Sequence, residues 1–283
     1  MKIETLFLCL ILFILFLFIG ATGSEAFQIK VSPQRIYQGD VFVIKVSGMK
    51  HSPSPSAILE GKQMSFSSCG EGCFIAIGAV DIDTKPGRKT VSLNIRKKKT
   101  KVKFSARSKE FPLIYLTLSE EKVSPGEEDM KRIEKENERL KELWGKETEK
   151  IWEGDFIKPV ENEISTVFGT KRVLNQERES IHRGIDLKAK EGEEVRASNS
   201  GKVMLAEELF FGGNTLILDH GQGIYTVYMH LSVFNVKPGD IVSKGEVIGL
   251  AGSTGRASGP HLHFSVKVSG TSANPVSLFG LKL

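Results

Sequence analysis

The chain has 283 residues, of which 40% are hydrophobic and 26% are charged, and its formal net charge is +5. This composition is typical of globular proteins and excludes bulk disorder and fibrous repeats, and the length allows two modest domains with a connector. The mild positive charge is spread over mixed-charge stretches, and the basic residues are not interleaved with stacking aromatics. We therefore expect no nucleic-acid partner.

The N-terminus carries a targeting signal. Lys2 precedes an apolar run from Leu6 to Ile19, and Ser24-Glu25-Ala26 resembles a small-x-small cleavage site. This layout predicts that residues 1–26 are a secretory signal peptide. The run is short for a membrane-spanning helix, which needs about 20 apolar residues, but attachment to the inner membrane through residues 6–22 is the alternative. In both cases we expect an exported protein of the periplasm or cell envelope.

Residues 27–118 are expected to form short strands. Apolar residues recur at every second position in several segments, such as Phe42, Ile44 and Val46 or Val91, Leu93 and Ile95. Several short strands separated by glycine and proline turns predict a β-sandwich that resembles immunoglobulin-like modules. Cys69 and Cys73 bracket a glycine turn and are compatible with a disulfide across a hairpin, which we favour over free thiols or half of a metal site.

Residues 119–155 have a different composition. Ser124-Pro125-Gly126-Glu127 forms a capping box with proline at the first helical position. Met130, Ile133, Leu140 and Trp144 then form a thin apolar stripe among many charged residues. The pattern predicts a charged helical connector that ends near Gly145 and packs this stripe on a neighbouring domain. A coiled-coil dimer is the alternative, and the sequence leaves the oligomeric state open.

Residues 156–283 are rich in glycine and predict a mainly antiparallel β domain without a long amphipathic helix. Strands are expected at 214–219, 225–230, 246–250 and 261–268. The expected fold class is thus mainly β: an N-terminal immunoglobulin-like sandwich, a charged helical connector and an antiparallel β domain. Glycine-rich loops at 211–213 and 252–259 are expected to border an open groove.

Five of the six histidines lie between positions 182 and 263, and four of them belong to three local patterns. His182 and Asp186 are four residues apart, a spacing that puts both side chains on one face of a strand or a helix. His261 and His263 share one face of a strand, so both imidazoles can enter one site. His230 is expected to end a strand, and His220 is expected to be structural in a hairpin turn.

These residue types suit zinc chemistry. Catalytic zinc takes three protein ligands and keeps one position for water, and two histidines with one aspartate fit its borderline character. Such a site lowers the pKa of bound water toward neutrality. The remaining histidines can move protons near physiological pH. The alternatives are purely structural roles: a surface ion pair for His182 and Asp186, a core histidine for His263 and a turn cap for His230.

The combination of motifs resembles the lysostaphin-like, LytM-type M23 metallopeptidases. The matching segments lie between about Phe156 and Phe279: Phe168-Gly169-Thr170-Lys171-Arg172, His182-Arg183-Gly184-Ile185-Asp186-Leu187, Gly213-Asn214-Thr215, Asp219-His220-Gly221, Tyr228-Met229-His230-Leu231, and Thr254-Gly255-Arg256 through His263-Phe264. The resemblance implies that His182, Asp186 and His263 bind one catalytic Zn²⁺. It implies that one of His230 and His261 is the general base and that the other stabilises the oxyanion.

The resemblance also implies a function: hydrolysis of peptide crosslinks or bridges in peptidoglycan, which would be the partner of the protein. The alternative is a wall-binding module without catalysis, or an activator of other wall hydrolases. All five candidate residues are present, which favours the enzyme. The sequence does not distinguish a diaminopimelate-type crosslink from a glycine bridge. It also leaves open whether the N-terminal domain binds wall, holds a partner or covers the groove.

Overall fold

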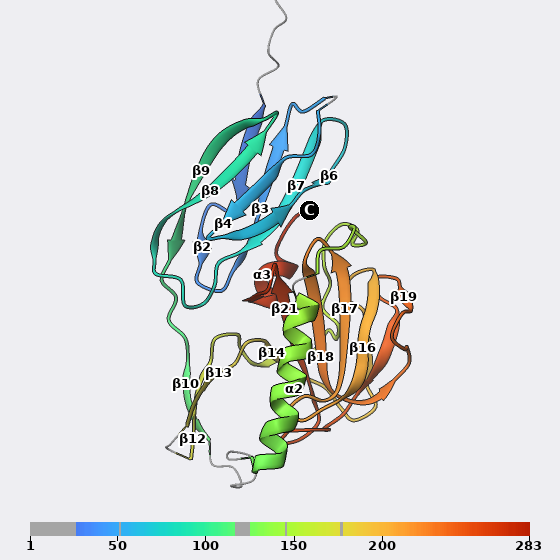
Figure 1. Ribbon diagram of the computed structural model, residues 1–283. Helices are drawn as coiled ribbons and strands as arrows, with labels where there is room; N and C mark the ends of the chain where they lie inside the picture. The colour runs from blue at the N-terminus through green and yellow to red at the C-terminus, as the bar shows by residue number, and fades with distance from the viewer. Residues whose placement is uncertain (1–26, 51, 117–124, 145, 176–177) are drawn as a thin grey trace, which may run out of the picture.

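The computed structural model of the protein describes residues 27–50, 52–116, 125–144, 146–175 and 178–283. The chain is mainly β, as predicted, and its strands form four sheets (Figure 1). The expected signal peptide, residues 1–26, and the membrane attachment through residues 6–22 lie outside the described residues. Within the described ranges, no helix is long and apolar enough to cross a membrane.

Two sheets at the N-terminal end enclose one apolar core. One has the order β1 (Gln28–Ser32), β3 (Val41–Ser47), β7 (Cys73–Ala79) and β6 (Ser67–Ser68). The other has the order β2 (Ile36–Tyr37), β9 (Lys98–Arg107), β8 (Gly87–Ile95), β4 (Ser56–Leu59) and β5 (Lys62–Ser65). Alternate residues point inward, so that Val91, Leu93 and Ile95 are buried while their neighbours are exposed.

This two-sheet domain contains the predicted disulfide between Cys69 and Cys73. The amide N–H of Cys69 donates to the carbonyl of Cys73 at 3.0 Å, so the bond closes a short turn. The strand pattern of the sequence is confirmed here, whereas the immunoglobulin-like identity of the domain and its boundary at residue 118 stay predictions.

The connector forms a single long helix, α2 (Glu127–Trp144), with Glu127, Glu128 and Asp129 in its first turn. Negative charges at the N-terminal end of a helix interact favourably with the helix dipole and stabilise the helix. Ser124, the predicted capping residue, lies outside the described residues. Leu140 and Trp144 pack on the buried Tyr225 and its neighbours on the C-terminal sheet, and the Trp144 and Tyr225 ring centroids are 5.3 Å apart. The helix thus packs on a neighbouring domain, as predicted, and this is the C-terminal domain; Met130 of the predicted stripe is 39% exposed.

The C-terminal domain is built on a ten-stranded sheet whose pairings are all antiparallel. Its main order is β11 (Ile164–Thr166), β14 (Ile185–Lys188), β21 (His261–Val268), β18 (Ile224–Phe234), β17 (Gly213–Gly221), β16 (Gly201–Leu209) and β19 (Ile241–Val242). Joined to this path are β15 (Glu194–Arg196), β20 (Val247–Ala251) and β22 (Thr271–Ala273), and the short helix α3 (Pro275–Phe279) follows.

A small fourth sheet joins the segment that follows the N-terminal domain to the C-terminal part of the chain. β10 (Leu113–Leu116) pairs in parallel with β12 (Lys171–Leu174), which pairs with β13 (Arg178–Ile181). β10 lies inside the range assigned to the N-terminal domain, yet its partner belongs to the C-terminal part of the chain. The sheet stands below the N-terminal domain in Figure 1.

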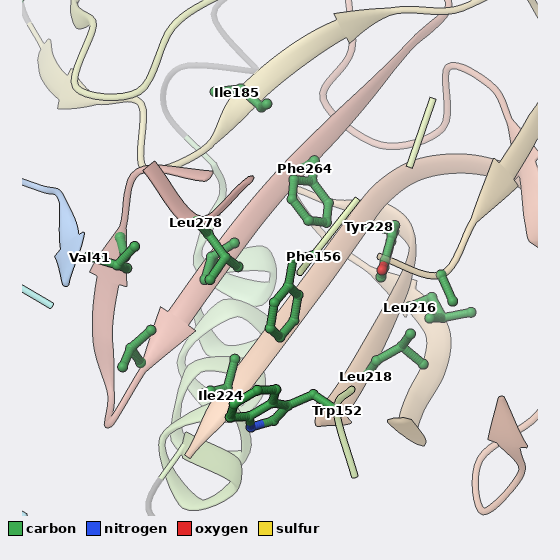
Figure 2. Packing of buried hydrophobic residues seen from close by; sticks show 14 of the residues in the cluster. Val41, Trp152, Phe156, Ile185, Leu216, Leu218, Ile224, Tyr228, Phe264 and Leu278 are labelled. Atoms are coloured by element: carbon green, nitrogen blue, oxygen red, sulfur yellow. The ribbon is translucent and has the colours of Figure 1, made fainter. Parts of the chain in front are cut away.

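The two-sheet domain and the C-terminal domain share a buried apolar cluster. Val41 and Ile77 from the first belong to the same cluster as Phe264 and Leu278 from the second, and Figure 2 shows Val41 near Leu278. The interface requires glycine at position 39. The φ of Gly39 is +85°, and a Cβ there would lie 2.4 Å from the ring of Phe168. The N-terminal domain is therefore packed against the segment that leads into the candidate site.

Candidate metal centre

Three side chains meet at one end of the C-terminal sheet. His182 Nε2 lies 2.9 Å from Oδ1 of Asp186 and 2.9 Å from Nδ1 of His263, and the last two atoms are 2.8 Å apart. The side chains are 3%, 10% and 14% exposed, respectively. The three residues assigned to the metal from the sequence thus form one cluster that could hold an ion.

The sheet register explains how Asp186 and His263 meet. Asp186 on β14 is the direct cross-strand partner of His263 on β21. Side chains at such a pair lie on the same face of the sheet. Leu187 and Leu262 point to the opposite face and are fully buried, as the alternating pattern predicted.

The backbone between His182 and Asp186 differs from the prediction. It follows the end of β13, and a bend at Gly184 separates it from β14, so His182 and Asp186 do not share one continuous strand. A Cβ at Gly184 would lie 2.6 Å from the carbonyl oxygen of Phe264 and 2.7 Å from Nε2 of His263. The bend needs glycine because the backbone passes directly against the His263 ring.

Backbone contacts fix the His182 ring. Nδ1 of His182 lies 3.1 Å from the carbonyl oxygen of Val167, which can only accept, so Nδ1 carries the proton and Nε2 presents its lone pair to the cluster. The His182 amide donates to the carbonyl of Thr170, and its own carbonyl accepts from Gly169. The segment that positions His182 is therefore the one that packs against Gly39 of the N-terminal domain.

His230 and His261 lie beside the cluster. Their ring centroids are 4.8 Å apart, and the His230 centroid is 6.1 Å from that of His263. Nε2 of His261 is 3.8 Å from Oδ1 of Asp186. In each ring Nδ1 lies 2.8 Å from a carbonyl oxygen, Thr254 O for His230 and Gly259 O for His261, so that both Nε2 lone pairs are available.

The prediction that His230 ends a strand is wrong, because β18 continues to Phe234. His230 has φ +65° at an irregularity in the pairing of β18 with β17, and its amide donates to the carbonyl of Gly212. A non-glycine residue with positive φ is uncommon and often marks a functional site. The bulge turns the His230 side chain toward the histidines of β21.

Burial sets the protonation of these groups. Burial lowers the pKa of His230 to about 4, although the Thr254 carbonyl opposes the shift, and burial also lowers the pKa of His263. For Asp186, burial would raise the pKa, but the contacts with His182 and His263 outweigh it and hold the pKa well below its ordinary value. His230 and His263 are therefore neutral near pH 7, and Asp186 is ionised.

The cluster fits zinc by the chemistry of its donors. Nε2 of His182, Nδ1 of His263 and a carboxylate oxygen are all lone-pair donors within 3 Å of one another, and such atoms repel unless a proton or cation lies among them. Two imidazoles and one carboxylate are a ligand set of catalytic zinc sites, in which a fourth position stays open. Asp186 keeps its second oxygen for another partner.

That partner is Arg172, to which the sequence motifs gave no role. Nη2 of Arg172 donates to Oδ2 of Asp186 at 3.0 Å. The residue lies in the matching segment from Phe168 to Arg172, so a signal was present, but only the fold brings β12 to Asp186. Ligating carboxylates are commonly held by such a second contact.

His220 is not part of the cluster. It lies within β17, completely buried, and not in a turn as predicted. Its Nδ1 donates to the carbonyl of Ser200, and its Nε2 lies 2.7 Å from the hydroxyl of Thr226, which also contacts the hydroxyl of Tyr228. This buried network supports the core of the domain, which agrees with a structural role.

An open groove of about 1030 Å³ extends from the cluster. Asp186 and His261 lie at its side, and Thr166, Glu163 and Lys188 line it further out. The 252–259 loop contributes Ser258 and Gly259, as predicted, whereas the 211–213 loop does not line this groove. Gly213 instead packs closely on Thr254 and Gly255.

The site lies in a segment with known relatives. Residues 180–275 match the model of peptidase family M23, so the chain contains an M23 peptidase domain. The DD-carboxypeptidase/endopeptidase Mpg of Neisseria meningitidis is 41% identical over 128 residues, which cover 44% of this chain and 29% of that protein. The peptidoglycan DD-endopeptidase ShyA of Vibrio cholerae is 38% identical over 112 residues, 39% of this chain and 26% of that protein.

Lysostaphin of Staphylococcus staphylolyticus is 44% identical over 91 residues, which cover 31% of this chain and 19% of that protein. The chain therefore spans less than a third of the length of these curated relatives. A crystal structure from Pseudomonas aeruginosa, described as peptidase M23, aligns over 86% of this chain and 94% of that chain with a TM-score of 0.69 and 28% identity. The likeness to this structure includes most of the N-terminal region.

Proposed function

We propose that the protein is a zinc-dependent endopeptidase that hydrolyses peptide crosslinks or bridges of bacterial peptidoglycan. The observation that carries the proposal is the meeting of His182, Asp186 and His263 beside the two further histidines, His230 and His261, within the M23 domain. The relatives named as peptidoglycan DD-endopeptidase and lysostaphin support the same class of reaction.

Each side chain has a part in the reaction. His182, Asp186 and His263 hold the zinc ion, which, when bound, supplies Lewis-acid polarisation of the scissile carbonyl. Arg172 holds Oδ2 of Asp186 and leaves Oδ1 for the metal side of the cluster. This arrangement fixes the carboxylate before metal or substrate arrives.

His230 and His261 move protons. Their Nδ1 protons are tied to backbone carbonyls, so each ring presents a neutral Nε2 of fixed direction. One Nε2 takes the proton from the attacking water. The other histidine takes up a proton from solvent when the substrate binds, donates a hydrogen bond to the developing oxyanion and keeps that proton. The proton taken from water then passes to the amine that leaves, which completes the cleavage of the amide.

The form of the groove supports a polymeric substrate. It is open and lies along the surface between β11, β14 and the turn after β14, so an extended peptide can enter from the side. The N-terminal domain contributes no residue to its lining within the described residues.

We place the protein outside the cytoplasm, in the periplasm or cell envelope. The Cys69–Cys73 disulfide supports this location, because such bonds persist in oxidising compartments. The apolar run from Leu6 to Ile19 supports export, with residues 1–26 as a cleaved signal peptide or residues 6–22 as an inner-membrane anchor.

The test uses protein from residue 27 onward, loaded with zinc and incubated with peptidoglycan sacculi, and the released fragments are identified by mass spectrometry. New amine and carboxyl ends at one type of amide are expected, and they should be absent with a zinc chelator and in His263→Ala. Arg88→Gln, a change at an exposed arginine on β8, is the matched control and should cleave normally. Binding of zinc without any released fragment would favour a wall-binding or activating role.

A further inference from the structure

The charged residues of the N-terminal domain are unevenly placed. None of the strands β1–β9 contains an aspartate or a glutamate. Two acidic residues of its loops contact the C-terminal domain. Oδ1 of Asp40 accepts from Nδ2 of Asn274 at 3.0 Å. Oδ2 of Asp83 accepts from Nη2 of Arg183 at 3.5 Å. The opposite end of the domain carries lysines instead.

Strand β3 runs between these two ends. Val41 and Val43, at its beginning, belong to the apolar cluster shared with the C-terminal domain. Lys45, nearer its other end, is exposed, and the equally exposed Lys30 lies directly opposite it on β1. Like charges at such a pair destabilise a sheet. Lys45 lies between β1 and β7, so it does not protect a sheet edge either. The fold therefore does not require this pair of charges.

The turn between β8 and β9 adds three further lysines. Arg96 and Lys97 form this turn with φ of +50° and +64°, whereas two-residue hairpin turns with positive φ favour asparagine and glycine. Lys97, Lys98 and Lys99 are exposed. Nη2 of Arg96 donates to the carbonyl of Gly48 at 3.0 Å and so ties the turn to the end of β3. The turn thus carries positive charge at a cost in backbone conformation.

These five lysines form the basic end of the domain: Lys30, Lys45, Lys97, Lys98 and Lys99. Within the described part of the chain none of them forms an ion pair. Glu71, in the loop that contacts Met49, is already paired with Lys50 at 3.3 Å. A surface of one sign that neither stabilises the fold nor has internal partners favours an external partner of the opposite charge.

The chain enters the domain at the basic end. Gln28 of β1 pairs with Ser47 of β3, next to the Gly48 that accepts from Arg96. The described chain starts at the top of Figure 1, and the C-terminal sheet lies below the two-sheet domain. Where residues 6–22 are kept as an anchor, the chain from residue 22 to Phe27 spans at most about 18 Å, which holds the basic end close to the bilayer.

We propose that the basic end docks the protein on an anionic phospholipid surface and that the peptidase domain lies on the far side of the two-sheet domain. Lysine suits this partner because its ammonium is a point charge on a flexible stem and needs no fixed geometry of the phosphate. The lysines come from both sheets around the entry of the chain, so a flat surface contacts them together. The docking uses no residue of the metal centre and does not depend on the peptidase function.

The test uses protein from residue 27 onward, which lacks the apolar run and keeps every described strand and helix and the apolar cores of both domains. It is sedimented with vesicles of phosphatidylcholine alone or of phosphatidylcholine mixed with phosphatidylglycerol. We expect binding to the anionic vesicles and not to the neutral ones. Binding should fall steeply between about 0.1 M and about 1 M salt, because the Debye length shortens from about 10 Å to about 3 Å.

Variants locate the binding surface. The triple variant Lys45→Gln, Lys98→Gln, Lys99→Gln should bind the anionic vesicles about 100-fold more weakly, at about fivefold per lysine. Arginine at the same three positions should preserve binding, because the charge is kept. The matched control removes three exposed lysines elsewhere and should bind like wild type: Lys135→Gln and Lys141→Gln on α2 and Lys202→Gln on β16.

Equal binding of wild type to neutral and anionic vesicles would overturn the proposal, as would a triple glutamine variant that binds as tightly as the matched control. Binding to purified sacculi but not to anionic vesicles would also overturn it and would assign the basic end to a wall polymer. Hydrolysis of a soluble crosslinked muropeptide should be the same in the triple variant and wild type. Charge-dependent vesicle binding by a protein that hydrolyses nothing would support the docking and contradict the peptidase function.

Discussion

The two-sheet N-terminal domain and the C-terminal peptidase domain are both β structures, but their interiors differ. Within the described residues up to 116, Thr84 is the one buried polar side chain, and all the others lie at Thr170 or beyond. A polar group is buried at a cost unless it is hydrogen-bonded. In the peptidase domain, the polar side chains of His182, Asp186 and His230 are buried because they form the candidate site. The N-terminal domain keeps an apolar core and supports its neighbour.

The largest effects on activity are expected from substitutions of the buried polar residues of the peptidase domain. His263→Ala removes a metal ligand and should lose zinc together with at least about a thousandfold of kcat/KM, because a metal supplies several kcal/mol of transition-state stabilisation.

His230→Asn should keep one zinc per chain and lower kcat by about 10²–10⁴-fold, the usual contribution of a general acid or base. Zinc content by mass spectrometry and steady-state kinetics separate the two. Loss of zinc in His230→Asn would mean that this residue is a ligand.

The support from the N-terminal domain can be tested at the interface. Phe168 is 2% exposed and packs on Gly39, so Phe168→Ala should lower the free energy of unfolding by about 3–5 kcal/mol. Zinc affinity should fall as well, because the following segment holds His182. Tyr115→Ala, at a 70% exposed aromatic on β10, is the control and should change stability by no more than about 0.5 kcal/mol. Unchanged stability in Phe168→Ala would contradict a supporting role.

His220 makes the polar interior sensitive to acid. Burial lowers its pKa to about 4 in the folded protein, against 6.5 without burial. The unfolded chain therefore takes up the proton first, so the contribution is complete above pH 6.5 and is lost as the pH falls from 6.5 to 4. The loss is about 3 kcal/mol at 1.36 kcal/mol per pKa unit. Urea unfolding of His220→Gln should show a correspondingly flatter dependence on pH, and an unchanged slope would refute the assignment.

The smallest effect is expected in the apolar N-terminal domain. The Cys69–Cys73 disulfide joins two residues at a sequence separation of 4, and chain entropy predicts a stabilisation of about 2 kcal/mol for so short a loop. Replacing both cysteines by serine should lower the unfolding midpoint without changing kcat or zinc content. A fall in hydrolysis in this variant at a temperature where the protein is folded would show that the two domains are coupled more strongly than their shared core implies.

Local periodicity predicted the parts of the site that lie within one strand. His261 and His263 alternate with the buried Leu262, so their shared face followed from the sequence. The pairing of Asp186 with His263 depends on the register between two strands far apart in the chain, and only the family resemblance suggested it. The bend at Gly184 and the bulge at His230 were missed, because neither changes the hydrophobic pattern.

The non-local contacts were the least predictable. The bond from Arg172 to Asp186 joins two strands of different sheets, and the contact of Gly39 with Phe168 joins two domains. Such contacts depend on how sheets and domains pack against one another, and a local sequence pattern does not predict this packing. The helix α2 was predicted within a few residues, because its charged composition and apolar stripe are local signals.

The most direct test of the account is anomalous diffraction at the zinc absorption edge from crystals of the zinc-loaded protein. The account predicts one strong peak among Nε2 of His182, Oδ1 of Asp186 and Nδ1 of His263, at about 2.0–2.2 Å from each atom, the usual range for these ligands. Arg172 should remain on Oδ2 of Asp186. A peak elsewhere, or none at this cluster in protein that cleaves peptidoglycan, would contradict the assignment of the metal centre.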